Sequence, residues 1–100
     1  MNPVLLTLIA PPELEESLVD WLLARDEISG FTGQLAYGHS RAHGAYSLVE
    51  QVTGRQRRIT YRIQTDEQTA RALIEALRPD FAGAGVRYWL LPLLAAGRID

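Results

Sequence analysis

The chain contains no cysteine, no lysine and no apolar run long enough to cross a membrane. Without cysteine there can be no disulfide, no thiolate metal ligand and no thiol nucleophile. The longest apolar stretch, residues 89–96, is interrupted by Pro92 and is far shorter than the ~20 residues that a spanning helix needs. Residues 4–10 follow no basic residue and precede no cleavage site, so we do not expect them to form a signal peptide. We expect one cytoplasmic domain, residues 1–100, without membrane insertion.

The missing lysines make the distribution of charge informative, although the net charge is only −2. Residues 1–30 carry six acidic residues against Arg25 alone. Residues 31–62 reverse this balance, with Arg41, Arg55, Arg57, Arg58 and Arg62 against Glu50. Arginine matches phosphate and carboxylate oxygens better than lysine does, so this second region indicates either an anion-binding patch or a solvated surface. Nucleic-acid binding is not expected, because the chain is acidic overall and has no basic helix face or aromatic stacking platform.

Apolar periodicity predicts two helices and four strands. Alternation of polar and apolar residues indicates strands at residues 4–9, 31–39, 58–64 and 86–91. Helical spacing indicates amphipathic helices at residues 11–25 and 66–78. The order strand, helix, strand, strand, helix, strand predicts an α+β ferredoxin-like βαββαβ fold. Its antiparallel sheet carries both helices on one face, with a long loop between strands 2 and 3.

Local signals refine these elements. Thr65 is expected to cap the second helix in a capping box completed by Gln68, and Pro79 is expected to end that helix. Gly33, inside the second strand, indicates either a bulge or a close contact with a helix.

The face of the sheet that no helix covers is expected to form a contact between subunits. Alternation places Thr32, Gln34, Arg62 and Gln64 on that face, together with Trp89 or its neighbours. Such a mixed surface can be solvated, or it can be the surface where identical subunits meet. In a domain of this size we favour the association of identical subunits. Leu93 and Leu94, beyond Pro92, are expected to be buried against another subunit. The alternative is that they fold back onto the helices of their own chain.

The segment 40–57, too long for a hairpin turn, holds the candidate metal and anion ligands. His39, His43 and Glu50 supply two imidazoles and a carboxylate, a set suited to zinc, copper or nickel. They can equally be polar loop residues. Arg55, Arg57 and Arg58 are candidates for anion contact, although Arg55 can instead pair with Glu50 and order the loop. The candidate ligands are therefore a divalent metal or a small anion, with no certain cofactor.

Four sequence pieces resemble the PII superfamily of small ferredoxin-like proteins. They are Phe31-Thr32-Gly33, Tyr37-Gly38-His39, Glu50-Gln51-Val52-x-Gly54-Arg55 and Tyr88-Trp89-Leu90-Leu91-Pro92. They are most similar to uncharacterised bacterial PII-like proteins that are often encoded beside heavy-metal efflux pumps. The resemblance implies a homotrimer in which segment 40–57 is the effector-responsive loop, and it implies a membrane transporter or efflux component as partner.

The same resemblance implies a ligand site between subunits. In PII proteins, nucleotides contact the base of the long loop, here Gly38 and Arg58, and a glycine-rich loop before the last strand, here Gly83 and Gly85. This chain departs from the pattern: Val86 follows the glycines where a basic residue is usual, and Arg87 comes one place later. A shift of one residue turns a side chain to the opposite face of a strand, which weakens the expectation of ATP or ADP binding. The glycines can also form a plain turn.

No catalytic arrangement is present in the sequence, so we do not expect an enzyme. The chain has no Ser/His/Asp order, no paired buried carboxylates and no phosphate-binding loop signature. The leading hypothesis is a non-catalytic trimeric regulator whose segment 40–57 responds to an anion, nucleotide or metal and contacts a partner. One alternative is a divalent-metal-binding tolerance protein similar to the CutA family. The other is a structural oligomerisation module without a ligand.

Overall fold

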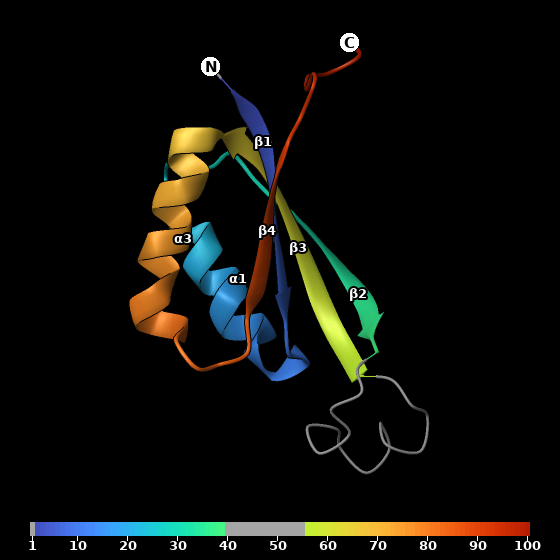
Figure 1. Ribbon diagram of the computed structural model, residues 1–100, viewed down its shortest axis with the longest axis vertical. Helices are drawn as coiled ribbons and strands as arrows, with labels where there is room; N and C mark the ends of the chain where they lie inside the picture. The colour runs from blue at the N-terminus through green and yellow to red at the C-terminus, as the bar shows by residue number, and fades with distance from the viewer. Residues whose placement is uncertain (1, 40–55) are drawn as a thin grey trace.

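The computed structural model describes residues 2–39 and 56–100. Within them, the strands are β1 (Pro3–Ala10), β2 (Thr32–Gly38), β3 (Gln56–Asp66) and β4 (Arg87–Pro92). The helices are α1 (Glu15–Leu23) and α3 (Glu67–Phe81), and a short 3-10 turn, η1 (Pro12–Leu14), leads into α1. The predicted order of elements is confirmed, but the first helix is shorter than residues 11–25, because its proline-containing start forms the 3-10 turn (Figure 1).

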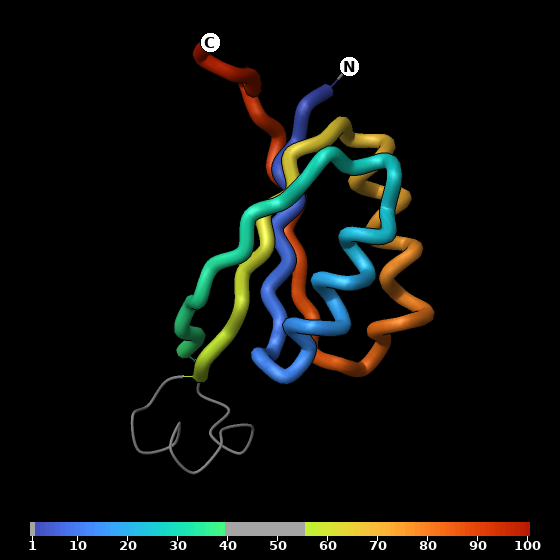
Figure 2. Tube along the Cα trace, turned by 180° about the vertical axis from the view of Figure 1, so that it is seen from behind, coloured from blue at the N-terminus to red at the C-terminus, as the bar shows by residue number. Residues whose placement is uncertain are grey.

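The sheet has the strand order β2-β3-β1-β4, and every neighbouring pair is antiparallel. Both helices lie on the same side of it, as the views in Figure 1 and Figure 2 agree. This is the predicted ferredoxin-like α+β fold. Its core is formed where the inward-facing residues of β1 and β3 meet the apolar stripes of the helices. The core side chains are Val4, Leu6, Leu8, Ala10, Leu18, Leu22, Ile59, Tyr61, Ile63, Ala70, Leu73, Ile74 and Leu77.

Gly33 marks a close contact between side chain and backbone rather than a bulge. The pairing of β2 with β3 is continuous, and Gly33 lies directly opposite Tyr61. A Cβ atom at Gly33 would lie 3.3 Å from Cε1 of the Tyr61 ring. Phe31 meets the same ring edge-on, with the ring centroids 6.1 Å apart. The glycine therefore makes room for the tyrosine, the largest fully buried side chain among the described residues.

Two expectations about the second helix were wrong. Its cap is Asp66 rather than Thr65: the Asp66 carboxylate accepts hydrogen bonds from the Thr69 backbone N–H at 2.8 Å and from the Thr69 hydroxyl at 3.0 Å. Thr65 still belongs to β3, where it pairs with Val4. Pro79 does not end the helix, which continues to Phe81. A proline in the last turn forfeits only one backbone bond, and the Ala82 N–H still bonds to the Arg78 carbonyl.

The chain termini and two of the connections between helices and strands lie at opposite ends of the sheet. In Figure 1, the two termini lie at one end, and the β1–η1 and α3–β4 connections lie at the other, together with the close of β2 and the start of β3. The predicted long connection began at residue 40 and ended at 57, but Gln56 and Arg57 already belong to β3. Residues 40–55 lie outside the described residues. None of the described helices is long and apolar enough to cross a membrane.

The segment after β4 runs away from the helices (Figure 1). The Leu93 N–H donates to the Pro3 carbonyl at 3.0 Å, which holds the start of this segment beside β1. Leu94 is fully exposed. The alternative in which both leucines fold back onto the helices of their own chain is therefore wrong, and burial against another subunit stays a prediction.

Candidate functional site

The uncovered sheet face carries the residues that alternation assigned to it. The strand registers align Trp89, Thr7, Arg62 and Thr32 in one row across the four strands. Gln34 and Gln64 lie on the same face, because they pair with Thr60 and Leu5 in neighbouring rows. Trp89 is 41% exposed and Leu91 is 48% exposed. We call this surface the open face. It combines exposed apolar area along β4 with polar groups along β3 and β2.

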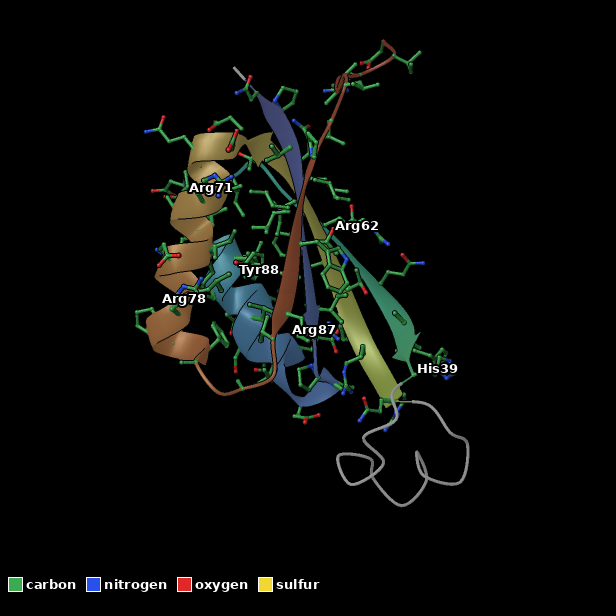
Figure 3. The ribbon with its side chains drawn as sticks, viewed as in Figure 1. His39, Arg62, Arg71, Arg78, Arg87 and Tyr88 are labelled. Carbon is green, nitrogen blue, oxygen red and sulfur yellow. The ribbon has the colours of Figure 1, made fainter. Side chains whose placement is uncertain are left out.

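Arginines of the open face already have partners within the chain. Arg62 Nη1 donates to Gln34 Oε1 at 2.8 Å, across the β2–β3 pair. The guanidinium carbon of Arg87 lies 5.3 Å from the centroid of the Trp89 ring, within the range of a cation–π interaction. Figure 3 shows Arg87 on one side of β4 and Tyr88 on the other, turned toward α3.

Arg58 is held at the end of the sheet by its own strand. Its Nη1 donates to the Arg57 carbonyl and its Nη2 donates to Gln56 Oε1, both at 2.7 Å. Gly38 lies across the strand pair, where an added Cβ would contact the Arg58 side chain at 3.7 Å. The two predicted loop-base residues are therefore neighbours. His39 follows them and is exposed.

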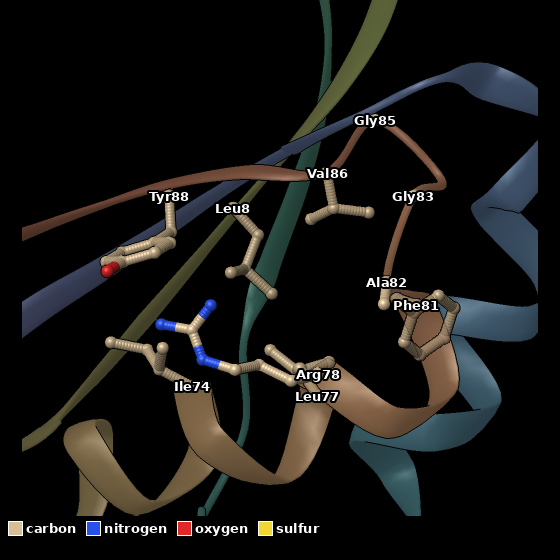
Figure 4. Close-up of a pocket in the computed structure, with 10 residues that line it drawn as sticks. All are labelled: Leu8, Ile74, Leu77, Arg78, Phe81, Ala82, Gly83, Gly85, Val86 and Tyr88. Carbon is tan, nitrogen blue, oxygen red and sulfur yellow. The ribbon is translucent and has the colours of Figure 1, made fainter.

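A groove of about 330 Å³ lies between α3 and β4, on the helix side of the sheet (Figure 4). Leu8, Ile74, Leu77, Phe81 and Val86 give it an apolar lining, and Gly83 and Gly85 form its end, while Arg78 and Tyr88 supply its polar groups. The two glycines have φ angles of 77° and 84°. This left-handed conformation strains other residues, so glycine is needed for the turn that closes the groove.

Arg78 is the cationic residue among those lining the groove. Its Nε donates to Glu75 Oε2 at 3.1 Å. In Figure 4 the two terminal nitrogens extend over the groove on the side of Leu8 and Tyr88. The hydrogen bond and charge of Glu75, and then a hydrogen bond with Tyr88, raise the pKa of Arg78 above its usual value. The guanidinium is therefore firmly charged at the rim of an apolar surface.

The predicted ligand residues fall into two separate places. Gly83 and Gly85 line the groove together with Val86, whereas Arg87 points to the open face. Gly38 and Arg58 lie on β2 and β3, which β1 separates from β4 in the sheet. Arg55 lies outside the described residues, so its part in anion contact stays a prediction.

The predicted metal site is only partly within the described residues. His43 and Glu50 lie outside them, and His39 is the one member of the set whose position is known. Residues 2–39 and 56–100 hold no cluster of three histidine, cysteine or acidic side chains able to bind a metal ion. Because two of the three predicted ligands are not covered, the metal site stays a prediction.

Sequence reasoning missed Arg78 and Tyr88. Arg78 was read only as the last residue before a proline, and Tyr88 only as part of a motif. Alternation along β4 carried the missing signal: Val86, Tyr88 and Leu90 share the face that turns toward the helices. Arg78 lies in the last turns of α3, one residue after the buried Leu77. The glycine turn follows α3 and leads directly to Val86, so Arg78 and Val86 lie on the two sides of this turn in the sequence.

Comparison with known proteins identifies relatives along the entire chain. The model of the family described as "Protein of unknown function (DUF3240)" matches residues 1–100. The crystal structure of a DUF3240 family protein from Shewanella baltica is 25% identical, covers 100% of this chain and 99% of that chain, and superposes with a TM-score of 0.80. A Thermus thermophilus protein described as PII-like and signalling is 18% identical, with 93% and 88% covered and a TM-score of 0.66. Curated proteins gave no significant match.

Proposed function

The chain belongs to the DUF3240 family, and on that premise we propose that it is a non-catalytic regulatory protein of the PII-like type. Three copies associate through the open face, and a small ligand alters segment 40–57 so that its affinity for a protein partner changes. The partner is a membrane transporter or efflux component, and the protein acts in the cytoplasm. The shared fold with a PII-like protein supports this proposal.

The observation that carries the proposal is the apolar surface of β4 on the open face. Trp89 and Leu91 are large, exposed and adjacent in register to Thr7 and Leu5 of β1. No described helix covers them (Figures 1 and 2). A contiguous apolar patch on a small domain marks a contact surface, and closed symmetric association is the usual way for identical chains to cover one.

The response to a ligand is proposed for the end of the sheet where β2 closes and β3 begins. Gly38 and Gln56 are paired there, with Arg58 next to them. A change at segment 40–57 would be anchored on this rigid pair of strands. A candidate effector is an anion such as a nucleotide or bicarbonate, or a divalent metal.

Hydrogen exchange of the full chain tests the regulatory function. Exchange is measured at residues 40–57 with ATP, ADP, bicarbonate, Zn²⁺ or Cu²⁺, and binding is measured in parallel by calorimetry. A switch predicts that one of these ligands binds and slows exchange in this segment. A variant lacking residues 42–54 serves as the control for signals that arise elsewhere.

Two other outcomes would contradict the proposal. Stoichiometric uptake of Zn²⁺ or Cu²⁺ that slows no exchange, and that is lost in the double variant His39→Ala, His43→Ala, would identify a metal buffer of the CutA type. If no ligand binds, and cells carrying the variant that lacks residues 42–54 show unchanged physiology, the protein would be a structural oligomerisation module.

A further inference from the structure

The groove between α3 and β4 has the size of a site for one small organic molecule. Its volume of about 330 Å³ falls at the lower end of the range of natural ligand sites. A dry apolar cavity of about 150 Å³ already holds a benzene ring. The groove therefore has room for a ring or a branched alkyl group with a short polar arm.

The walls of the groove divide by chemistry. Leu8 of β1, Ile74 and Leu77 of α3 and Val86 form the apolar part. At one rim, Arg78 brings its terminal nitrogens toward Tyr88, as Figure 4 shows. The Nε of Arg78 is hydrogen-bonded to Glu75, whereas its two terminal nitrogens extend over the groove (Figure 4). The edge formed by these two nitrogens is suited to the two oxygens of a carboxylate, which a guanidinium binds in a forked arrangement.

The local charge limits the ligand to a single negative charge. Arg78 is the one cationic side chain among the residues that line the groove, and Glu75 already neutralises part of its charge. A triphosphate carries several charges and needs several cationic partners or a metal. An apolar body with one carboxylate matches both the lining and the rim.

We infer that this groove binds a monoanionic carboxylate with an aryl or branched alkyl body, such as an arylacetate or a branched-chain acid. Arg78 binds the carboxylate, the Tyr88 hydroxyl borders it, and the apolar wall holds the body of the ligand. This inference rests on the proposed function in one respect: the carboxylate is the effector that the regulator senses. It makes the effector an apolar acid rather than a nucleotide.

Titration of the ¹⁵N-labelled full chain tests the site. Phenylacetate, 4-methylpentanoate, the neutral phenylacetamide and ATP are added separately, and amide shifts are followed. We expect both acids to shift the amides of Gly83, Gly85 and Val86. Phenylacetamide is expected to bind about tenfold more weakly than phenylacetate, because a hydrogen bond to a charged group is lost. ATP is expected to leave these amides unmoved.

Two variants on the same helix separate the groove from general charge effects. Arg78→Gln is expected to weaken phenylacetate binding about tenfold. Arg71→Gln is the matched control: Arg71 also pairs with a glutamate of α3, Glu67, at 2.9 Å, but it does not line the groove. The affinity of Arg71→Gln for phenylacetate should stay within about twofold of the wild-type affinity. The comparison of phenylacetate with phenylacetamide uses the wild-type chain, so it tests the site even if a variant does not fold.

Several results would overturn the inference. They are equal affinity for phenylacetate and phenylacetamide, unchanged affinity in Arg78→Gln, and shifts confined to residues outside the groove. An absence of shifts at millimolar concentration would also overturn it, as when a neighbouring chain fills the groove.

Hydrogen exchange distinguishes failure of the proposed groove site from failure of the proposed switch in residues 40–57. If phenylacetate binds without slowing exchange in residues 40–57, the site stands and the switch fails; if only another ligand slows exchange, the switch stands and the site fails.

Discussion

Tyr61 is a large aromatic residue in the core of the domain. Its ring is 1% exposed, lies opposite Gly33 and meets Phe31 edge-on. Its hydroxyl is buried and has no hydrogen-bond partner among the described residues. The ring therefore supplies the packing, while the hydroxyl carries a desolvation cost that no bond offsets.

Tyr61→Phe should be neutral or stabilising at neutral pH. The substitution keeps the ring and removes the unsatisfied hydroxyl, so we expect the free energy of unfolding to stay the same or rise by up to about 1 kcal/mol. Tyr61→Ala is the contrasting variant and should lose roughly 3–5 kcal/mol, as for other large aromatic residues replaced in a core. Urea denaturation measures both. A marked loss of stability in the phenylalanine variant would mean that the hydroxyl has a partner after all.

The same residue gives the protein a stability loss in alkali. Burial, and then the negative charge of Glu15, raise the pKa of Tyr61 above its ordinary value of 10.0. Above pH 10 the unfolded chain ionises at this tyrosine before the folded chain does, so unfolding becomes more favourable as pH rises. Tyr61→Phe removes this contribution. Its unfolding free energy should fall less steeply than that of the wild type above pH 10, and parallel curves would contradict the argument.

At the scale of elements, the start of α3 depends on one carboxylate. Asp66 accepts from both the backbone N–H and the hydroxyl of Thr69, and these bonds hold the pKa of Asp66 below its ordinary value of 3.8. The capping therefore stabilises the fold above pH 3.8. It is lost as the pH falls through the lowered folded-state pKa, where the carboxylate gains a proton.

Asp66→Ala should lower the melting temperature at pH 7, whereas Asp66→Asn should lower it less, because asparagine also caps helices well. The difference between the wild type and Asp66→Asn should shrink as the pH is lowered below 3.8, since the wild-type side chain then loses its charge. Thermal unfolding followed by circular dichroism from pH 7 to pH 2.5 measures this. A difference between the two proteins that does not change with pH would show that the charge plays no part.

Much of the fold follows from the sequence, because burial on one face imposes alternation that can be read directly. The alternation of Ile59, Tyr61 and Ile63 predicted β3 correctly. It also predicted which residues of β3 lie on the open face, and the pairing of β3 with β1 and β2 agrees with this. The cap was misplaced by one residue, because Thr65 and Asp66 are both good caps and only the length of β3 decides between them. The groove was missed for another reason. Its parts come from β1, α3 and β4, and only the folded chain brings Leu8, Arg78 and Tyr88 together.

At the scale of the whole molecule, the helices protect only one side of the sheet. The core lies between that side and the helices, while large apolar side chains remain exposed along β4 and beyond it, including Trp89, Leu91 and Leu94. Among the described strands, β2 and β4 form the two edges of the sheet. Exposed edges and apolar surface favour association. The proposed association of copies of the same chain would cover the open face.

Trp89→Glu should disrupt this association. A carboxylate in the centre of a desolvated contact is costly, whereas Trp89 is too exposed in the single chain for the fold to depend on it. The matched control is Leu23→Glu, because Leu23 is also large and exposed, at 70%, but lies on α1 away from the open face. Sedimentation velocity should show a smaller particle for Trp89→Glu and an unchanged particle for Leu23→Glu. The opposite pattern would place the contact on the helical side.

The molar mass of the wild-type protein in solution tests the central claim most directly. Light scattering after size exclusion, at micromolar concentration and physiological salt, should give three times the 11.2 kDa mass of the chain. A mass of 11.2 kDa across the concentration range would mean that the open face stays uncovered, and it would contradict the account of this protein as a PII-like assembly.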